Sequence, residues 1–440
     1  MKRHFTTLNI CFLLVFLLSI SSFAIESDNR TLQADIAVDT STTSVLPVKL
    51  TLSNCIAITI AHHPTLISSR EQINIAKSQK RQALSSFYPQ VNISSNYKGS
   101  KAEDEESTKS LAATGSVSQL IYDFGVTPAN IREADENINI EMQNYYSTEL
   151  TILLNVKTAY YTVLQNQEAV AIAQETLDNA KLHLKLAERS YTIGIVAKLD
   201  VAKAQVEVAN AELSLVSAKN EYLVSIRSLN NAMGLEANTY ENIELPETSY
   251  SSVSTELSQL ILIALRDRPD VRIFKNEREQ LKAGLLVAER GHFPTISASG
   301  NYSESGNTTP LNYSWSGTLG LSFSLFNGFN TEAQIQQSKA KLRNLDALEQ
   351  KMVQDVQLDV TTNYLNVKSG EEKIKSAQTL VDQAKESPQL ATGRYQNGLG
   401  SFLDLSDAQV SYSNARISLS QSIYAYQINL AQLQKSIGQK

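Results

Sequence analysis

The sequence of 440 residues has few cysteines, no series of long apolar runs and no excess of basic residues. Two cysteines cannot make a disulfide framework. A polytopic helical membrane protein is excluded, because it needs several apolar runs of about 20 residues. Lys+Arg 39 against Asp+Glu 45 gives a net charge of -6 without a basic block, so we expect no nucleic-acid partner. Hydrophobic residues make up 42%, which argues against wholesale disorder.

The first residues have the pattern of an export signal. Lys2 and Arg3 precede an apolar run from Ile10 to Ile20, and small residues around Ala24 suit a signal peptidase. The apolar run is too short to span a membrane. We therefore predict a signal peptide over 1–24, a flexible tail over 25–48 and an exported mature protein.

Motifs for catalysis and metal binding are missing. His62 and His63 are adjacent, whereas a helical zinc pair needs histidines four residues apart. After the signal peptide only Cys55 remains, and one cysteine makes no metal cluster. Gly398-Leu-Gly400 lacks a third glycine and a preceding strand. The sequence predicts no enzyme, no catalytic residue, no metal site and no cofactor.

The mature chain is a tandem repeat with a displacement of 204 to 205 residues. The clearest matches are His63-Pro64 with Arg268-Pro269, and Tyr191-x-x-Gly194 plus Asp200 with Tyr395-x-x-Gly398 plus Asp404. We expect repeat 1 over 49–234, a linker over 235–255 and repeat 2 over 256–440. Self-similarity of this kind indicates two copies of one structural unit.

Each repeat contains two segments in which every second residue is apolar or glycine. The expected strands are 88–98, 111–122, 293–303 and 313–326. Segments 89–97, 111–122, 294–302 and 313–326 contain no charged residue, and aromatic residues lie at their ends. This pattern is typical of transmembrane β-strands, with one face toward lipid and one toward a lumen. The alternative is a soluble sandwich, whose outer face would normally carry charge.

Four strands cannot stand alone in a bilayer. An open sheet edge leaves backbone groups unpaired in hydrocarbon, and each such group costs several kcal/mol. The sheet must therefore close by joining strands from other copies, which predicts an oligomer.

Long helices occupy the rest of each repeat. We expect helices over 49–87 and 256–292, and helical hairpins within 126–234 and 330–437. Apolar residues recur every seven positions in the hairpins, with alanine at the second seam position, which predicts tight left-handed antiparallel coiled coils. Pro388 replaces Leu184 of repeat 1 and should bend its helix.

This arrangement resembles the TolC-like outer-membrane efflux protein family. Its residues here are Tyr191-Thr-Ile-Gly194, Tyr395-Gln-Asn-Gly398 with Asp404 and Asp407, Tyr122-Asp-Phe-Gly125 and Phe326-Asn-Gly-Phe329. The resemblance implies an α+β membrane protein, a homotrimer with one 12-stranded β-barrel and an α-helical barrel. It implies the outer membrane of a Gram-negative bacterium, with the helices extending into the periplasm.

The same resemblance implies function and partners. The trimer would be a passive exit duct of a tripartite efflux or type I secretion system. A periplasmic adaptor protein and an inner-membrane pump of RND, ABC or MFS type would dock to it. Two alternatives stay open, namely a secreted coiled-coil adhesin and a pore-forming protein, and the sequence does not identify a cargo.

The resemblance also assigns sites at the hairpin tips. A periplasmic gate would comprise Asp404, Asp407, Asp200 and Tyr395, with acidic rings attracting cations at the pore mouth. The residues themselves allow another interpretation, in which Ser401-x-x-Asp404 is a helix capping box and Asp200 acts similarly. Gly400 stands where some relatives have an arginine that holds the entrance shut.

Hairpin tips in the family meet the adaptor. The matching residues here are Gly194, Ile195, Gly398, Leu399 and Ser401. The glycines also have a structural role, because a glycine commonly ends a helix in the left-handed conformation.

Overall fold

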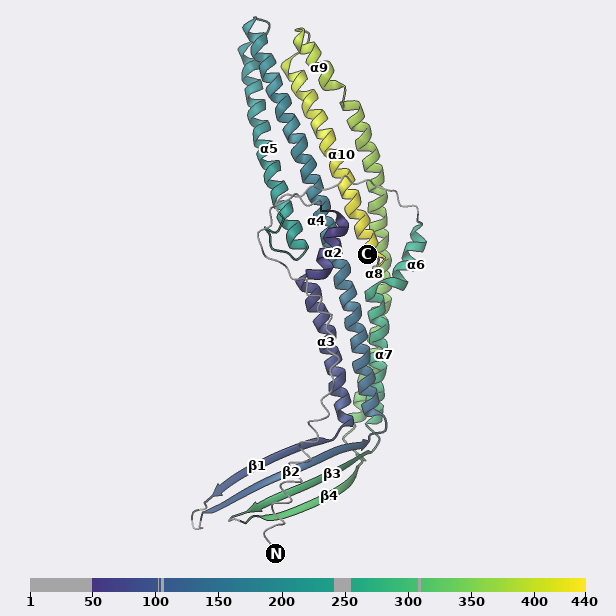
Figure 1. Cartoon of the computed structure of the whole chain (residues 1–440). Coiled ribbons are helices and arrows are strands. Elements are labelled where there is room, and N and C mark those ends of the chain that lie inside the picture. The colour runs from purple at the N-terminus through teal and green to yellow at the C-terminus, as the bar shows by residue number, and fades with distance from the viewer. Residues whose placement is uncertain (1–49, 102, 104–106, 241–254, 308–309) are drawn as a thin grey trace. The chain divides into compact units, whose positions relative to one another are not determined.

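The computed structural model describes residues 50–101, 103, 107–240, 255–307 and 310–440. The signal peptide 1–24, the tail 25–48 and most of the linker 235–255 lie outside these ranges. All described residues belong to one compact unit (Figure 1). The first repeat consists of α2 (Leu52–His62), α3 (Pro64–Leu84), the short helix η1 (Ser85–Phe87), β1 (Gln90–Ser100), β2 (Thr108–Tyr122), α4 (Val126–Thr192) and α5 (Lys198–Ala232).

The second repeat passes through the same order. It consists of α6 (Leu257–Asp267), α7 (Pro269–Arg290), β3 (Thr295–Gly306), β4 (Asn312–Ser322), α8 (Asn330–Ala384), α9 (Ser387–Gln396) and α10 (Phe402–Ser436). The tandem organisation, the mostly helical content and the strand pair in each repeat are confirmed. No helix within the described ranges combines the length and the apolarity that crossing a membrane requires.

One expectation was wrong at the start of each repeat. Segment 49–87 forms α2, α3 and the short η1, and segment 256–292 forms α6 and α7, so neither is one continuous helix. His63 and Arg268 are extended, with ψ values of 121° and 132°, and the proline after each opens the next helix. The reason is that proline lacks an N–H and disfavours the helical conformation in the residue before it.

Pro388 has a milder effect in the second hairpin. α8 ends at Ala384, and α9 begins at Ser387 with Pro388 in its first turn. The corresponding part of α4 continues without interruption to Thr192. A proline in the helix interior removes one hydrogen bond, and Lys385 and Glu386 keep right-handed helical dihedrals, so the helix is interrupted locally between α8 and α9.

The four strands form one antiparallel sheet in the order β1-β2-β3-β4 (Figure 1). Their bounds lie within four residues of the expected segments, and the largest difference is at 313–326. There β4 ends at Ser322, which pairs with Thr295, the first residue of β3. Residues 323–326 lie beyond the start of β3 and so have no partner strand among the described residues.

The register of the sheet separates apolar from polar side chains. Val91 pairs with Val117, and Tyr302 with Trp315, so these residues share one face. The following residues form this apolar face: Val91, Ile93, Tyr97, Leu111, Ala113, Val117, Ile296, Ala298, Tyr302, Tyr313, Trp315, Leu319 and Leu321. The opposite face is polar, with serine, threonine and asparagine predominating: Asn92, Ser94, Asn96, Ser110, Thr114, Ser116, Ser297, Ser299, Asn301, Ser303, Ser314, Ser316 and Thr318. The alternation read from the sequence therefore becomes two chemically distinct surfaces.

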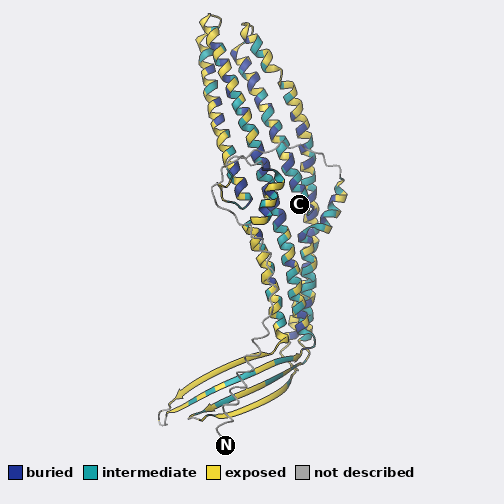
Figure 2. Ribbon diagram, viewed as in Figure 1, coloured by how far each residue is buried: buried dark blue, intermediate teal, exposed yellow. Residues whose placement is uncertain are grey.

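Neither face of the sheet is covered by the part of the chain that the structure describes. Every residue of β1 is exposed, as is nearly every residue of β4 (Figure 2). Trp315 is 78% exposed and Leu319 is 76% exposed. β1 and β4 are the edge strands of this sheet, so within the described ranges apolar surface is exposed and backbone hydrogen-bonding groups at both edges lack partners.

Four long helices lie side by side in the order α5, α4, α10 and α8 (Figure 1). α4 has 67 residues, which corresponds to about 100 Å. The expected alanine seam between α4 and α5 is present, with Ala180, Ala204 and Ala211 buried. In the second repeat Val356, Val360 and Val367 are buried in the core of α8 and α10.

At the end of each hairpin opposite its tip, a glycine packs against the residue that precedes the helix-starting proline of the same repeat. This contact is called the glycine joint. Gly234 follows α5 with φ +78°, and a Cβ there would lie 2.8 Å from the Cα of His63. Gly438 follows α10 with φ +77°, and a Cβ there would lie 3.0 Å from the Cα of Arg268. The residue before each proline therefore packs directly on the glycine that ends the same repeat.

Candidate functional site

The tips of the two hairpins are built from the same turn. α4 ends at Thr192, Gly194 in the turn after it has φ +78°, and the N–H of Ile195 donates to the carbonyl of Ser190 at 2.9 Å. α9 ends at Gln396, Gly398 in the turn after it has φ +71°, and the N–H of Leu399 donates to the carbonyl of Arg394 at 2.8 Å. This is the glycine-terminated helix end expected from the sequence.

The turns present apolar side chains to solvent. Ile195 is 53% exposed and Leu399 is 73% exposed, and Ile193 beside them is 69% exposed. Apolar groups of this size at both tips are available for contact with another chain.

Ser401 and Asp404 form a capping box at the start of α10. The Asp404 N–H donates to the Ser401 hydroxyl at 3.1 Å, and the Ser401 N–H donates to the Asp404 carboxylate at 3.0 Å. These bonds lower the pKa of Asp404 below its ordinary value, mainly through the backbone N–H of Ser401. Asp404 therefore caps the N-terminus of α10 in the structure.

The first repeat has no such box. Ala197 precedes α5 without a side-chain cap, and Asp200 lies in the first turn of that helix. In the second repeat Asp407 lies one turn after Asp404 on α10 and is exposed. Asp404 and Asp407 thus share one region of α10, where two carboxylates one turn apart face solvent in the single chain.

Tyr395 joins the two tips. Its ring is buried with Phe402 and Leu405 from α10 and Ala187 and Ala204 from the first hairpin. Burial, and secondarily the charge of Asp200, raise the pKa of the Tyr395 hydroxyl. Its hydroxyl oxygen is buried and accepts or donates no hydrogen bond within the described part of the chain.

Asp200 lies close enough to Tyr395 for its charge to act on the tyrosine hydroxyl. The turns also meet, since a Cβ on Gly398 would lie 3.5 Å from the Cγ2 of Ile195. Phe402, which sequence reasoning missed, packs against Tyr395 with ring centroids 6.0 Å apart. Its apolar character directly after Ser401 was the available signal.

Gly400 lies against Arg394, which the sequence analysis also missed. A Cβ on Gly400 would lie 3.2 Å from the Cβ of Arg394. The Arg394 guanidinium donates to the carbonyl of Leu399 at 3.3 Å, and its charge contributes to the lowered pKa of Asp404. The arginine nearest the turn thus stabilises its own hairpin.

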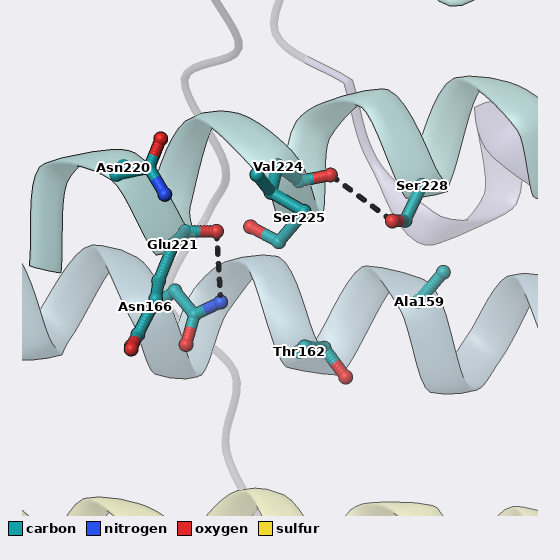
Figure 3. A pocket seen from close by; sticks show the side chains of 8 residues that line it. All are labelled: Ala159, Thr162, Asn166, Asn220, Glu221, Val224, Ser225 and Ser228. Atoms are coloured by element: carbon teal, nitrogen blue, oxygen red, sulfur yellow. Dashed lines mark hydrogen bonds between the residues drawn. The ribbon is translucent and has the colours of Figure 1, made fainter. Parts of the chain in front are cut away.

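A groove of about 440 Å³ lies between α4 and α5, away from the tips (Figure 3). Asn166 and Thr162 line it from α4, and Val224, Ser225 and Ser228 line it from α5. Glu221 is its sole ionisable lining residue, and the Asn166 amide donates to the Glu221 backbone carbonyl at 3.3 Å. Within the described ranges no three metal-ligating side chains come together. The groove offers no constellation for acid–base or metal chemistry.

Comparison with known proteins points to one family. A family model described as outer membrane efflux protein matches residues 56–235 and 260–439, one match in each repeat. Nodulation protein T of Rhizobium leguminosarum bv. trifolii is 24% identical over 391 residues, which are 84% of this chain and 81% of that protein. Outer membrane protein TolC of Escherichia coli (strain K12) is 23% identical over 406 residues, 86% of this chain and 80% of that protein.

Solved structures share the fold. The outer-membrane channel OprN superimposes with a TM-score of 0.76 at 18% identity, covering 88% of this chain and 90% of that one. The outer membrane protein VceC from Vibrio cholerae gives 0.75 at 17% identity, covering 88% and 96%. At this level of identity the likeness establishes the architecture.

Proposed function

The chain belongs to the outer membrane efflux protein family, and on that premise we propose that it is the outer-membrane channel of a tripartite efflux or type I secretion system. Three copies would form a passive duct that leads from the periplasm to the cell exterior. The observation that carries this proposal is the four-stranded sheet, whose two faces are uncovered and whose two edges are open among the described residues.

Closure of the sheet into a barrel would account for both its open edges and its uncovered faces. If β4 of one copy pairs with β1 of the next, three chains give a closed barrel of twelve strands without a free edge. The face with Trp315 and Leu319 would then contact lipid, and the face with Ser316 and Thr318 would line the lumen.

The helices support the same closure. α5 is buried against α4 along one seam, yet it carries a second apolar stripe with heptad spacing that is exposed in the single chain. This exposed seam consists of Leu199, Ala202, Val206, Ala209, Leu213, Val216, Asn220 and Leu223. α5 and α8 form the two outer sides of the four-helix layer. In a head-to-tail ring these two sides meet, so twelve helices would close a tunnel.

The tips would form the periplasmic entrance. Asp404 and Asp407 from three copies would place up to six carboxylates near the axis, where they attract cations. Tyr395 and Asp200 would hold the two tips of each copy together. Gly194, Ile195, Gly398, Leu399 and Ser401 would form the surface that meets a periplasmic adaptor, behind which an inner-membrane pump supplies the cargo.

A membrane-fraction experiment tests the trimer. We expect the protein in the outer membrane as a heat-sensitive trimer, and Leu213→Lys in the exposed seam should abolish trimer recovery. Ser214→Lys, at an exposed position beside the seam, is the matched control and should leave the trimer intact. Recovery of wild-type protein as a soluble periplasmic monomer would instead support a secreted adhesin or a pore-forming protein.

Planar bilayers test the gate. Replacing both Asp404 and Asp407 by alanine should weaken the block of single-channel current by divalent cations, because the acidic rings are gone. Asp382→Ala, an exposed acid on α8, serves as control. Unchanged block in the double variant would leave these residues only the capping role.

A further inference from the structure

The groove between α4 and α5 presents oxygen atoms that accept hydrogen bonds (Figure 3). The hydroxyls of Thr162, Ser225 and Ser228 each donate to a carbonyl three or four residues earlier in their own helix, at 2.8, 2.7 and 3.0 Å. The Asn166 amide donates to the Glu221 backbone carbonyl. With their donors engaged, these side chains offer mainly oxygen lone pairs to the groove, and lone pairs accept hydrogen bonds from a ligand.

The charge of this lining is negative. Glu221 is its sole ionisable residue, so no lysine or arginine lines the groove within the described ranges. The Glu221 side chain extends from α5 toward α4 beside Asn166 (Figure 3). A carboxylate among neutral acceptors attracts a positively charged hydrogen-bond donor, because charge-assisted hydrogen bonds are the stronger ones.

The groove also has the size and the apolar surface for an organic ion. Its volume of about 440 Å³ lies within the range of small-molecule sites, roughly 300 to 1,000 Å³. Ala159 of α4 and Val224 of α5 add apolar surface to the polar lining. The lining therefore suits an ammonium group attached to an apolar body better than a bare metal ion or an anion.

The groove lies on the side of the helix layer opposite α2. Tyr160 of α4 is buried in one cluster with Cys55 of α2, so this tyrosine marks the side that α2 covers. Thr162 follows two residues later on α4, and two residues correspond to a rotation of about 200° around the helix. The Thr162 side chain therefore points away from α2.

In the proposed ring of helices this uncovered side faces the bore. Twelve helices about 8 to 10 Å apart would enclose a bore roughly 25 Å wide. α2 packs on α4 and α6 packs on α8, so three chains bring six short helices to one side of the ring. Six further helices, each about 10 Å thick, would fill the bore, which places them outside and the groove inside.

We propose that the groove is a binding site for organic ammonium ions on the wall of the duct, with one site in each chain. The Glu221 carboxylate pairs with the ammonium group, oxygens of Thr162 and Asn166 accept its other hydrogen bonds, and Val224 contacts the apolar body. The position in the bore rests on the proposed channel function, whereas the binding chemistry belongs to the single chain. An ion pair open to solvent binds weakly, so amine cargo would be retained only briefly.

Ligand-observed NMR titration of the protein in a non-ionic detergent tests the binding chemistry. The probes are phenethylamine, its neutral analogue 2-phenylethanol and the anion phenylacetate, with detergent alone as a blank. Wild type should bind the amine about fivefold more tightly than the alcohol, as a solvent-exposed ion pair allows, and the anion least. Glu221→Gln should remove the preference for the amine, and Glu212→Gln, an exposed acid of α5 outside the groove, should keep it.

Filling the groove provides a second, independent variant. Ser228→Phe should abolish binding of phenethylamine, because the ring occupies the volume of the ligand. Asn210→Phe places the same ring at an exposed position of α5 away from the groove and should leave binding unchanged. Equal wild-type affinity for amine and alcohol, or a preference for the amine that survives both Glu221→Gln and Ser228→Phe, would overturn the proposal.

Thiol labelling of the trimer tests the position of the groove. N-ethylmaleimide should label both Ser228→Cys in the groove and Ser53→Cys at an exposed position of α2. A maleimide attached to a globular protein wider than the bore should label only Ser53→Cys. Wild type is the blank, since Cys55 is buried. Labelling of Ser228→Cys by the large reagent would put the groove on the outer surface and overturn its assignment to the duct wall.

The outcomes separate this inference from the function on which it rests. Failure to recover any trimer from the outer membrane would remove the proposed function, while selective amine binding by the single chain could still be measured. A conducting trimer without selectivity for the amine would remove the binding site alone.

Discussion

The two hairpin tips share one backbone design but use equivalent tyrosines in opposite ways. Tyr191 is 47% exposed on the first tip, whereas Tyr395 is 1% exposed between the tips. Ala197 leaves α5 without a side-chain cap, whereas Ser401 caps α10. The shared parts are those that a turn requires, and the differing parts lie where one repeat packs on the other. The two repeats therefore share the same backbone turn, but they differ in the side chains that pack between them.

The joints at the far ends of the hairpins show the same contrast. In the second repeat the Arg268 guanidinium bonds Asp270 and Asp359 at 2.7 Å and the Ser436 carbonyl at 2.9 Å. In the first repeat His63 occupies this place, and its Nδ1 accepts a hydrogen bond from the Thr65 N–H. Charged hydrogen bonds of Arg268 hold the joint of the second repeat. The joint of the first repeat is held mainly by the packing of His63 on Gly234.

The largest expected effect concerns the glycines of these joints. Gly234→Ala should lower the free energy of unfolding by about 3 kcal/mol, from a left-handed backbone and a clash with His63. Gly438→Ala should cost slightly less, because its nearest contact is longer. Thermal unfolding of the purified protein in detergent measures both. Gly393→Ala, in a helix with open space around it, should be neutral or stabilising.

The charged joint should depend on its side chain more than the other does. Arg268→Ala should cost about 2 kcal/mol, since it removes hydrogen bonds to two carboxylates and a carbonyl from a side chain that is 17% exposed. His63→Ala should cost less than half as much. Denaturant unfolding of both variants provides the comparison, and equal losses would contradict the distinction between the joints.

The caps can be exchanged between the repeats. Ser401→Ala should destabilise the second tip by about 1 kcal/mol, because the Asp404 N–H loses its acceptor. Ala197→Ser introduces the missing acceptor before Asp200 and should stabilise the first tip by a similar or smaller amount. Amide hydrogen exchange at the two tips would detect both changes, with Ser406→Ala as an uncapped control.

The smallest effect is a difference in acid sensitivity. The pKa of Asp404 in the folded protein lies below its ordinary value of 3.8. The ionised carboxylate therefore stabilises the second tip at pH values above 3.8. It is lost as pH falls from about 3.8 through the lowered pKa. The protection factors for amide hydrogen exchange at the second tip should thus fall in this range, and Asp404→Asn should remove that pH dependence. Loss of protection at neutral pH would contradict this assignment.

Sequence periodicity predicted most of the fold because it records which face of each element is covered. Val356, Val360 and Val367 repeat at helical spacing and are buried, and the alternation around Trp315 became one face of the sheet. The exposed seam with Leu213 and Val216 also follows a heptad spacing. This second seam was overlooked because two apolar seams on one helix give a sequence pattern that resembles a single wide apolar face.

Contacts between the repeats could not be predicted in this way. Arg416 and Glu175 are 241 residues apart, and no local pattern links them. The burial of Tyr395 also depends on the position of the first hairpin, since its equivalent Tyr191 is exposed in the same local sequence. The Pro64 break was missed because the helical pattern continues on both sides of it.

The uninterrupted length of α4 restricts how this protein can change size. Inserting one residue near its middle would rotate everything beyond by about 100°, turning Ala180 away from α5. Register with a coiled-coil neighbour returns only after seven residues, and α5 or α10 would need the same addition. The length of the hairpins can therefore change only in matched steps of seven residues, each of which corresponds to about 10 Å.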